Sequence, residues 1–292
     1  MTEEKFLKPQ DKKIGKTFAM LRKSKKLTLK EVTGAEFSES QASKFEKGES
    51  ELTISKFFTL LENSNIFLDE FRDVYNNYTD SELHLFSQKL AEAHSEKSRQ
   101  KVKQLIKFWQ EKTHEEPAKT YYHLNLTVTE CVLSYITGSK VLEENIDYLM
   151  EYLDNVEEWG RYELWLFGNC LIFFDDNMLD YYGKIILGKT DFYKNVPHNQ
   201  RMVLRTFLNL VDAWLQKGNL QQALKYINHL KDMKMNFDFL AERIMLSYHE
   251  GHYQYLFGNE NGKNIMKKAA QTLEDYGFER KAEAMFKEIE NL

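Results

Sequence analysis

Apolar residues recur every three or four positions along most of the chain, whereas the strict alternation typical of strands is scarce. This spacing places apolar side chains along one face of a helix, so it predicts amphipathic helices. Only three prolines, Pro9, Pro117 and Pro197, interrupt the 292 residues. Because proline disrupts the interior of a helix, their scarcity also favours an all-α fold.

A weak repeat with a period near 40 residues organises the chain from residue 72 to residue 292. In its clearest unit one helix runs to Leu215, Gly218 lies in the turn, and a second helix begins at Leu220. The predicted helical pairs cover residues 81–109, 127–153, 163–187, 203–230 and 241–277, with a last helix over 278–292. Such pairs stack into a right-handed solenoid of about five helical hairpins with a concave face and a C-terminal capping helix.

Residues 1–71 follow a different pattern, with shorter helical segments separated by polar turns. Thr28 can cap one helix, and Glu31 stands three residues later in the spacing of a capping box. Ser38 can cap the following helix, and Gly48 can end it in the left-handed conformation. These signals predict an N-terminal helix-turn-helix domain of four or five helices.

The helix expected over residues 39–46 carries a row of short hydrogen-bond donors on its outer face. In a helix-turn-helix this second helix enters the major groove of DNA, where glutamine can pair with adenine and serine adapts to several partners. Residues 12–30 hold eight basic and no acidic side chains, although the chain has a formal net charge of −5. A local basic patch favours a polyanion site, and lysine suits phosphates. The predicted DNA-contacting residues are Ser38, Ser40, Gln41, Ser43, Lys44, Arg22, Lys23 and Lys30. The alternative is an ordinary solvated helix face.

The segment LTLKEVTGAEFSESQASKFEKGESELTISKFFTLLENSNIFLDEF resembles the helix-turn-helix of the Rgg family (Rgg/GadR/MutR transcriptional regulators). The sharpest matches are SQASKFEKGESE, LDEF and, farther on, EEWGRYELWLFGN, and the resemblance covers nearly the whole chain. It implies a homodimeric cytoplasmic regulator of a double-stranded DNA operator. It also implies a repeat domain similar to tetratricopeptide arrays, which in several members receives a short secreted peptide after import. Leu29 and Thr33 depart from the usual glutamine and alanine, so one phosphate contact is in doubt.

A short hydrophobic signalling peptide, as the resemblance implies, would need partners for its backbone on the concave face. An asparagine amide offers both a donor and an acceptor. Asn169 and Asn209 lie 40 residues apart, at the same place in successive repeats, and Arg205 precedes Asn209 by one turn. Arg161 could meet a carboxylate of the ligand, as the resemblance suggests. The predicted peptide-binding residues are Arg161, Tyr162, Asn169, Phe173, Arg205, Asn209 and Tyr248. The aromatic members have the alternative role of packing between helices.

Catalytic and metal chemistry find little support in the sequence. The motif GNENGK is one residue short of the P-loop spacing, and Asn264 follows where Ser or Thr is needed. His249 and His252 have no further candidate ligands close by in the sequence. We therefore expect neither an enzyme nor a bound metal or cofactor.

The cysteines and the hydropathy of the chain predict its compartment. Cys131 and Cys170 lie in apolar surroundings and are expected to be buried thiols. No apolar run approaches the ~18 residues that a membrane span needs. The charged N-terminus lacks the apolar core of a signal peptide, so a cytoplasmic protein without membrane contact is expected.

Three functions remain open from the sequence. The first is a DNA-binding transcription regulator that is controlled by a signalling peptide, as in quorum sensing. The second is a DNA-binding repressor whose repeats serve only dimerisation or protein partners. The third is a repeat scaffold that inhibits a partner protein and does not bind DNA, although the intact basic run argues against it.

Overall fold

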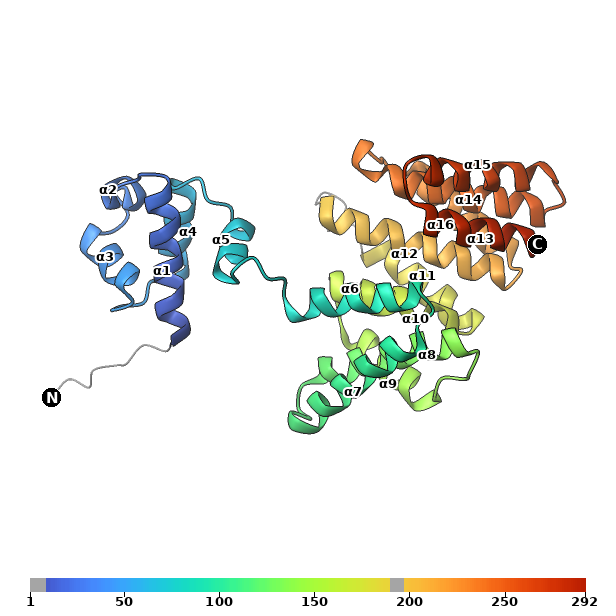
Figure 1. Cartoon of the computed structure of the whole chain (residues 1–292), viewed down its shortest axis with the longest axis horizontal. Coiled ribbons are helices and arrows are strands. Elements are labelled where there is room, and N and C mark those ends of the chain that lie inside the picture. The colour runs from blue at the N-terminus through green and yellow to red at the C-terminus, as the bar shows by residue number, and fades with distance from the viewer. Residues whose placement is uncertain (1–8, 190–196) are drawn as a thin grey trace. The chain divides into compact units, whose positions relative to one another are not determined.

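The computed structural model describes residues 9–189 and 197–292, which form sixteen α-helices and contain no strand (Figure 1). They belong to two compact units, one ending at Lys89 and one spanning Leu90–Leu292. The expected all-α class is therefore confirmed. Among these residues, no helix is both long enough and apolar enough to cross a bilayer.

The first unit packs its helices around one apolar core. The helices are α1 (Pro9–Ser24), α2 (Leu29–Thr33), α3 (Glu39–Lys47), α4 (Ile54–Asn63) and α5 (Leu68–Tyr75). The buried residues of the core are Phe18, Leu21, Val32, Phe45, Leu60, Leu61, Ile66, Phe71 and Val74. Since α5 supplies two of them, the first unit extends beyond the division expected at residues 71 and 72.

Local hydrogen bonds begin and end the short helices as the sequence predicts. The Thr28 amide donates to Glu31 Oε2 at 2.6 Å, and the Glu31 amide donates back to Thr28 Oγ1 at 3.2 Å. Ser38 Oγ accepts a hydrogen bond from the Gln41 amide at 3.3 Å. Gly48 ends α3 with φ 70° and ψ 33°, a left-handed conformation that glycine adopts without steric cost.

A close crossing and a buried ion pair fix α3 against α1. A side chain on Gly15 of α1 would overlap with the carbonyl oxygen of Phe45, so glycine allows the two backbones to approach. Arg22 donates from Nε to Glu46 Oε1 at 2.6 Å and from Nη2 to Glu46 Oε2 at 2.8 Å. Its Nη1 donates to the carbonyl oxygen of Leu27, which ties the turn after α1 to the same pair.

The Arg22–Glu46 pair corrects one sequence prediction. The two side chains are only 10% and 8% exposed, and the hydrogen bonds to Glu46 raise the pKa of Arg22. Because the guanidinium is committed to this carboxylate, Arg22 is not available to contact DNA. It stabilises the first unit instead.

The second unit is an array of helical pairs, and the first helix of the first pair spans the boundary between the units. The pairs are α6 (Glu82–Ser95) with α7 (Arg99–Glu115), α8 (Thr120–Thr137) with α9 (Glu143–Asn155), α10 (Arg161–Cys170) with α11 (Asp176–Lys189), α12 (Pro197–Gln216) with α13 (Leu220–Asp232), and α14 (Leu240–Leu256) with α15 (Asn261–Asp275). The short 3-10 helices η1 (Leu171–Phe173) and η3 (Phe237–Phe239) precede α11 and α14, and α16 (Glu279–Glu290) closes the array. Helices α8, α10, α12 and α14 pack in succession, while α9, α13 and α15 contact the first helix of their own pair and α16 packs on α15, which confirms the predicted array of hairpins and its cap.

Aromatic side chains and small residues hold the array together. Trp159 is fully buried, its ring centroid lies 5.5 Å from that of Phe167, and its Nε1 donates to the Leu153 carbonyl at 3.2 Å. A side chain on Gly262 of α15 would overlap with the backbone of Gly251, so α14 and α15 cross closely. The glycine crossing therefore fixes α14 closely against α15.

The two cysteines are buried free thiols, as expected. Cys131 in α8 and Cys170 in α10 have no solvent exposure. Contact with Cys131, together with burial, raises the pKa of the Cys170 thiol well above its usual value. Both thiols therefore belong to the packing between successive repeats.

The buried Arg22–Glu46 pair yields the first prediction. Arg22→Ala should destabilise the first unit by about 3 kcal/mol, because Glu46 would keep a buried charge without its partner. The matched control is Arg72→Ala, which removes an exposed ion pair to Asp73 and should cost less than about 1 kcal/mol. Hydrogen exchange of the α1 and α3 amides in the full chain measures both values. Equal protection in the two variants would contradict the structural role of Arg22.

Candidate functional site

The outer face of α3 forms the first candidate site. Ala42 and Phe45 are buried against the core, whereas Ser40, Gln41 and Lys44 are exposed on the other sides of the helix. This side of α3 therefore offers hydrogen-bond donors to solvent. Two further residues that were predicted to contact DNA are less accessible to a partner. Ser38 is exposed, but its side chain caps the helix, and Ser43 is half-buried.

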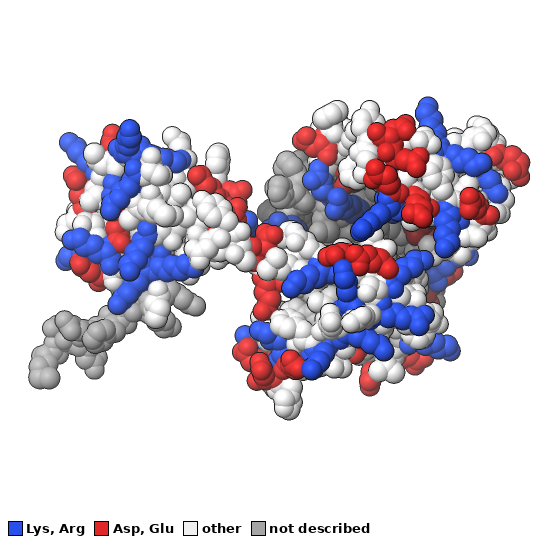
Figure 2. Space-filling model, in the orientation of Figure 1, with Lys and Arg blue, Asp and Glu red and all other residues white. Residues whose placement is uncertain are grey.

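Exposed basic side chains surround this helix. Lys23 and Lys30, both predicted as contacts, are exposed. Figure 2 shows Lys and Arg side chains spread over the visible face of the first unit, with acidic groups between them. Further exposed lysines in this unit are Lys12, Lys13, Lys16, Lys26 and Lys47. This distribution can hold a polyanion through several phosphate contacts.

Lys56 of α4 is a residue near this face that the sequence analysis missed. Its Nζ donates to Gln41 Oε1 at 3.1 Å, and the same ammonium lies 5.4 Å from the centre of the Phe37 ring. The sequence offers no signal for this contact, because Lys56 lies on another helix, fifteen residues from Gln41.

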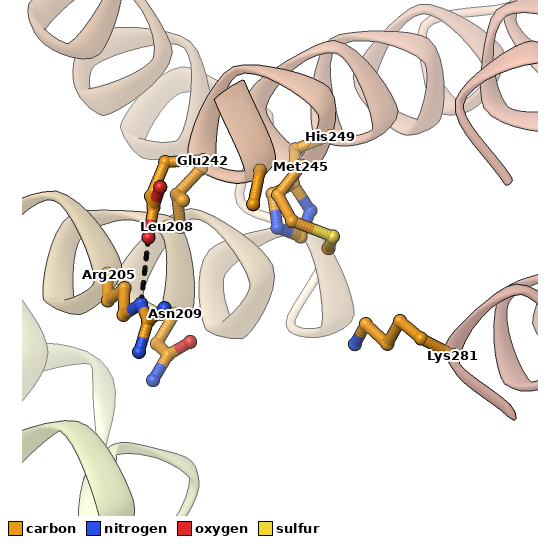
Figure 3. A pocket seen from close by; sticks show the side chains of 8 residues that line it. Arg205, Leu208, Asn209, Glu242, Met245, His249 and Lys281 are labelled. Atoms are coloured by element: carbon orange, nitrogen blue, oxygen red, sulfur yellow. Dashed lines mark hydrogen bonds and ion pairs between the residues drawn. The ribbon is translucent and has the colours of Figure 1, made fainter. Parts of the chain in front are cut away.

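The second candidate site is a pocket of about 180 Å³ in the second unit. It lies among α12, α14 and α16, and Figure 3 shows Lys281 of α16 across the opening from the other side chains. Leu208 and Met245 contribute apolar surface. The polar lining residues are Arg205, Asn209, Glu242, His249 and Lys281. A pocket with apolar surface and a few convergent polar groups is typical of ligand sites.

Glu242 fixes the arginine of the pocket. Its side chain is only 3% exposed, and its Oε1 accepts a hydrogen bond from Arg205 Nε at 2.9 Å (Figure 3). Arg201 Nε lies 3.5 Å from the same oxygen. A buried carboxylate is costly without a partner, so this pairing holds Arg205 in place at the pocket. The Arg205 side chain remains 60% exposed, so it stays accessible to a ligand.

The far side of the pocket combines a neutral histidine with an unpaired lysine. Burial lowers the pKa of His249 to about 3, and its Nδ1 has no hydrogen-bond partner among the residues that the structure describes, although Asp212 Oδ1 lies 4.0 Å away. Burial also raises the pKa of Asp212. Lys281 makes no ion pair with any residue in the described ranges. The lysine therefore adds a positive charge that an anionic group of a ligand can pair with.

Only Arg205 and Asn209, of the seven predicted peptide-binding residues, line this pocket. Asn209 Nδ2 donates to the carbonyl of Gly168 at 3.2 Å, next to Asn169 on α10. Asn169 Nδ2 donates instead to the Trp165 carbonyl one turn earlier, at 2.7 Å. The two asparagines thus lie near each other on adjacent helices, although only Asn209 contributes to the pocket.

The remaining predicted residues lie elsewhere in the second unit. Arg161 is exposed at the start of α10, without an ion pair among the residues that the structure describes. Tyr162 donates to Asn125 Oδ1 of α8 at 3.0 Å, so its hydroxyl joins two repeats. Phe173 is half-buried in η1.

Tyr248 corrects another prediction. Its side chain is 1% exposed and its hydroxyl donates to the Met285 carbonyl at 3.4 Å, within the core that α14 forms with α15 and α16. The next residue, His249, turns toward the pocket instead. One position corresponds to about 100° of rotation around a helix, so the exact rotation of α14 decides which residue a ligand can reach.

Sequence analysis missed six lining residues: Glu242, Met245, His249, Lys281, Leu208 and Ala241. The first three follow a helical spacing of three and four and so share one face of α14. That spacing is visible in the sequence, but it does not reveal which face borders α12. The sequence gives no sign that Lys281 lines the pocket, because α16 meets the pocket only in the folded array.

The comparisons with known proteins agree with this architecture. The C-terminal domain of the HTH-type transcriptional regulator Rgg matches residues 103–287. The chain belongs to the Rgg family. Members of this family are transcriptional regulators, and no group of three or more His, Cys, Asp or Glu side chains within residues 9–189 and 197–292 of this chain could hold a metal ion.

Solved structures of similar proteins cover almost the whole Rgg-family chain. A protein of Listeria monocytogenes EGD-e, provisionally described as a transcriptional regulator, has a TM-score of 0.81 at 23% identity, over 96% of this chain and 97% of that one. The SHP pheromone receptor Rgg2 of Streptococcus dysgalactiae has a TM-score of 0.73 at 24% identity, with coverage of 95% and 99%. PrgX in complex with cCF10 has a TM-score of 0.70 at 15% identity, with coverage of 96% and 99%.

The buried histidine of the pocket yields the second prediction. Its folded pKa of about 3 lies below the ordinary value near 6.5, so the unfolded chain binds the proton more readily between these values. The stability that neutral His249 contributes is thus present above pH 6.5 and is lost as the pH falls. From pH 7 to pH 5 the wild type should lose roughly 2 kcal/mol more than His249→Gln.

Denaturation followed by tryptophan fluorescence measures this difference, since all four tryptophans lie in the second unit. Asp212, His94 and His252 also have shifted pKa values. Because these residues are present in both proteins, their contributions to the loss of stability largely cancel in the difference. The exposed His114 provides the control, because His114→Gln should lose as much stability as the wild type. An identical loss in His249→Gln would contradict the assignment.

Proposed function

We propose that this chain is a DNA-binding transcription regulator whose second unit binds a short signalling peptide. The observation that carries the proposal is the pocket among α12, α14 and α16. It combines an asparagine amide, an arginine held by a buried carboxylate, a lysine and apolar surface. A short peptide presents matching groups: backbone amides, apolar side chains and a terminal or side-chain carboxylate.

The structural neighbours support the peptide as the ligand. Rgg2 of Streptococcus dysgalactiae is a pheromone receptor, and PrgX has been solved in complex with cCF10. In our proposal the peptide backbone pairs with Asn209, and its carboxylate approaches Lys281 or Arg205. Hydrophobic side chains of the peptide contact Leu208 and Met245.

The exposed donors of α3 support DNA as the second partner. Ser40 and Gln41 would face the major groove, while Lys23, Lys30 and Lys44 would contact phosphates. The protein would act as a homodimer through its second unit, because one helix-turn-helix contacts few base pairs and two half-sites give specific affinity. Peptide binding in one unit would then change transcription through the other.

The DNA arm of the proposal predicts the effect of one charge. Lys44→Ala should weaken binding and reduce the slope of log affinity against log salt by about one unit, because one phosphate contact is lost. The probe is the duplex that the wild type selects from a randomised pool, and fluorescence anisotropy measures its affinity. Lys103→Ala is the control, since Lys103 is an exposed lysine of the second unit and should leave the slope unchanged. An unaltered slope in Lys44→Ala would show that Lys44 makes no phosphate contact in the interface with DNA.

The peptide arm predicts the effect of one amide. Asn209→Ala should reduce peptide affinity by roughly 1 to 3 kcal/mol, the cost of an unsatisfied backbone group of the bound peptide. The probes are fluorescent synthetic peptides encoded by the short open reading frames that flank the gene, and fluorescence polarisation measures binding. Asn228→Ala, at an exposed position of α13 outside the pocket, is the control.

The same variants separate the two arms of the proposal. Asn209→Ala should leave DNA affinity of the unliganded protein nearly unchanged, since the residue lies in the other unit. Normal peptide affinity in Asn209→Ala would contradict the pocket as the binding site. Absence of binding by every tested peptide, with DNA binding intact, would favour a repressor whose repeats serve only dimerisation or protein partners.

A further inference from the structure

We propose that Lys56 fixes the side-chain amide of Gln41 as a hydrogen-bond donor, so that the chain selects guanine rather than adenine at the base pair that Gln41 reaches. This inference rests on the proposed DNA binding and names a determinant of its specificity. It replaces the adenine contact expected from the sequence, which requires that Gln41 both donate and accept.

The orientation of the Gln41 amide follows from the chemistry of its partner. Lys56 Nζ lies 3.1 Å from the terminal amide of Gln41. An ammonium has three donors and no acceptor, so the atom that it contacts must be the amide oxygen. The remaining polar atom of the side chain, Nε2, makes no hydrogen bond within the described part of the chain. The oxygen keeps a second lone pair, but a further donor there would lie beside the ammonium of Lys56, so the N–H groups of Nε2 are what Gln41 offers most readily to a further partner.

Lys56 is held at this place by more than one contact. Its side chain is half-buried at the first turn of α4, whereas Lys44 and Lys47 on α3 are exposed. The ammonium lies 5.4 Å from the Phe37 ring centre, a distance at which the ring face attracts a cation. Phe37 directly precedes Ser38, which caps α3. The lysine is thus positioned between the start of α3 and the side chain of Gln41.

The major-groove edges of the two purines respond differently to such a pair. Adenine presents the acceptor N7 and the donor N6, and a glutamine pairs with both only if its oxygen is available. Guanine presents two acceptors, N7 and O6. The amide Nε2 of Gln41 and the ammonium of Lys56 are both donors, so together they match guanine. Adenine would instead place the partly positive hydrogens of its amino group beside the ammonium of Lys56, which already uses one lone pair of the Gln41 oxygen.

The experiment is selection from a randomised duplex pool with the full-length protein, followed by sequencing. Gln41→Ala identifies the position that Gln41 contacts, because the base preference there should disappear. At that position the wild type should enrich guanine over adenine by roughly five- to hundredfold, the range for a good bidentate contact. Lys56→Met should lose that preference or shift it to adenine, since the amide oxygen becomes free to accept.

Two further variants separate hydrogen bonding from charge and from folding. Lys56→Arg keeps a cationic donor, so this variant should retain the preference for guanine at the position that Gln41 contacts. Lys47→Met removes an exposed charge of α3 that makes no contact with Gln41, so it should lower affinity without changing the selected base. Circular dichroism of each variant confirms that the helices are intact.

The outcomes distinguish this inference from the function on which it rests. If the wild type enriches no motif, the proposed DNA binding itself fails. If a motif is enriched but adenine occupies the Gln41 position, or Lys56→Met still selects guanine, the positioning role of Lys56 is refuted. The positioning role of Lys56 is also refuted if Gln41→Ala changes the base preference at no position of the selected motif. In that case Lys56 and Gln41 would contact phosphates only.

Discussion

Each helical pair of the second unit has apolar surface that only a neighbouring pair can cover. A single hairpin cannot bury both of its faces, so the pairs must stack, and the first helices of successive pairs become adjacent. Trp159 joins two neighbouring pairs, because its Nε1 donates to the Leu153 carbonyl of α9 while its ring contacts Phe167 and Tyr182 of the following pair. The pocket is a consequence of the same arrangement, because α12, α14 and α16 meet along it.

A buried charge in the stacked array is costly unless a partner neutralises it. Glu242 is almost completely buried, and the two arginines of α12 neutralise it. His249, by contrast, has a ring nitrogen without a hydrogen bond to any described residue, and it remains neutral because burial lowers its pKa. The pocket thus contains one arginine whose position is fixed, one neutral imidazole and one lysine that forms no ion pair within the described part of the chain. This combination gives the site its capacity for an anionic or amide-rich ligand.

Pairing within the protein also decides which basic residues of the first unit can act on a partner. Arg22 belongs to the basic run of the sequence, yet Glu46 binds its guanidinium inside the unit. Lys56 lies outside that run, yet it contacts Gln41 on the exposed side of α3. A count of charges in the sequence therefore includes Arg22, whose charge is used inside the unit, and omits Lys56, which lies beside the exposed side of α3. What matters is whether an acceptor of the same chain lies within reach.

The sequence by itself determined the helices, their ends and their grouping into hairpins. These features depend on residues within one or two turns of each other, as in the capping box of Thr28 and Glu31, the Ser38 cap and the left-handed Gly48. Only the tertiary structure decided which side chains face the pocket or the solvent. Tyr248 and His249 are neighbours in sequence, yet one is core and the other lines the pocket, because the packing against α15 sets the rotation of α14. Lys281 reaches the pocket, and Arg22 reaches Glu46, through contacts between segments far apart in the chain, which local sequence patterns do not encode.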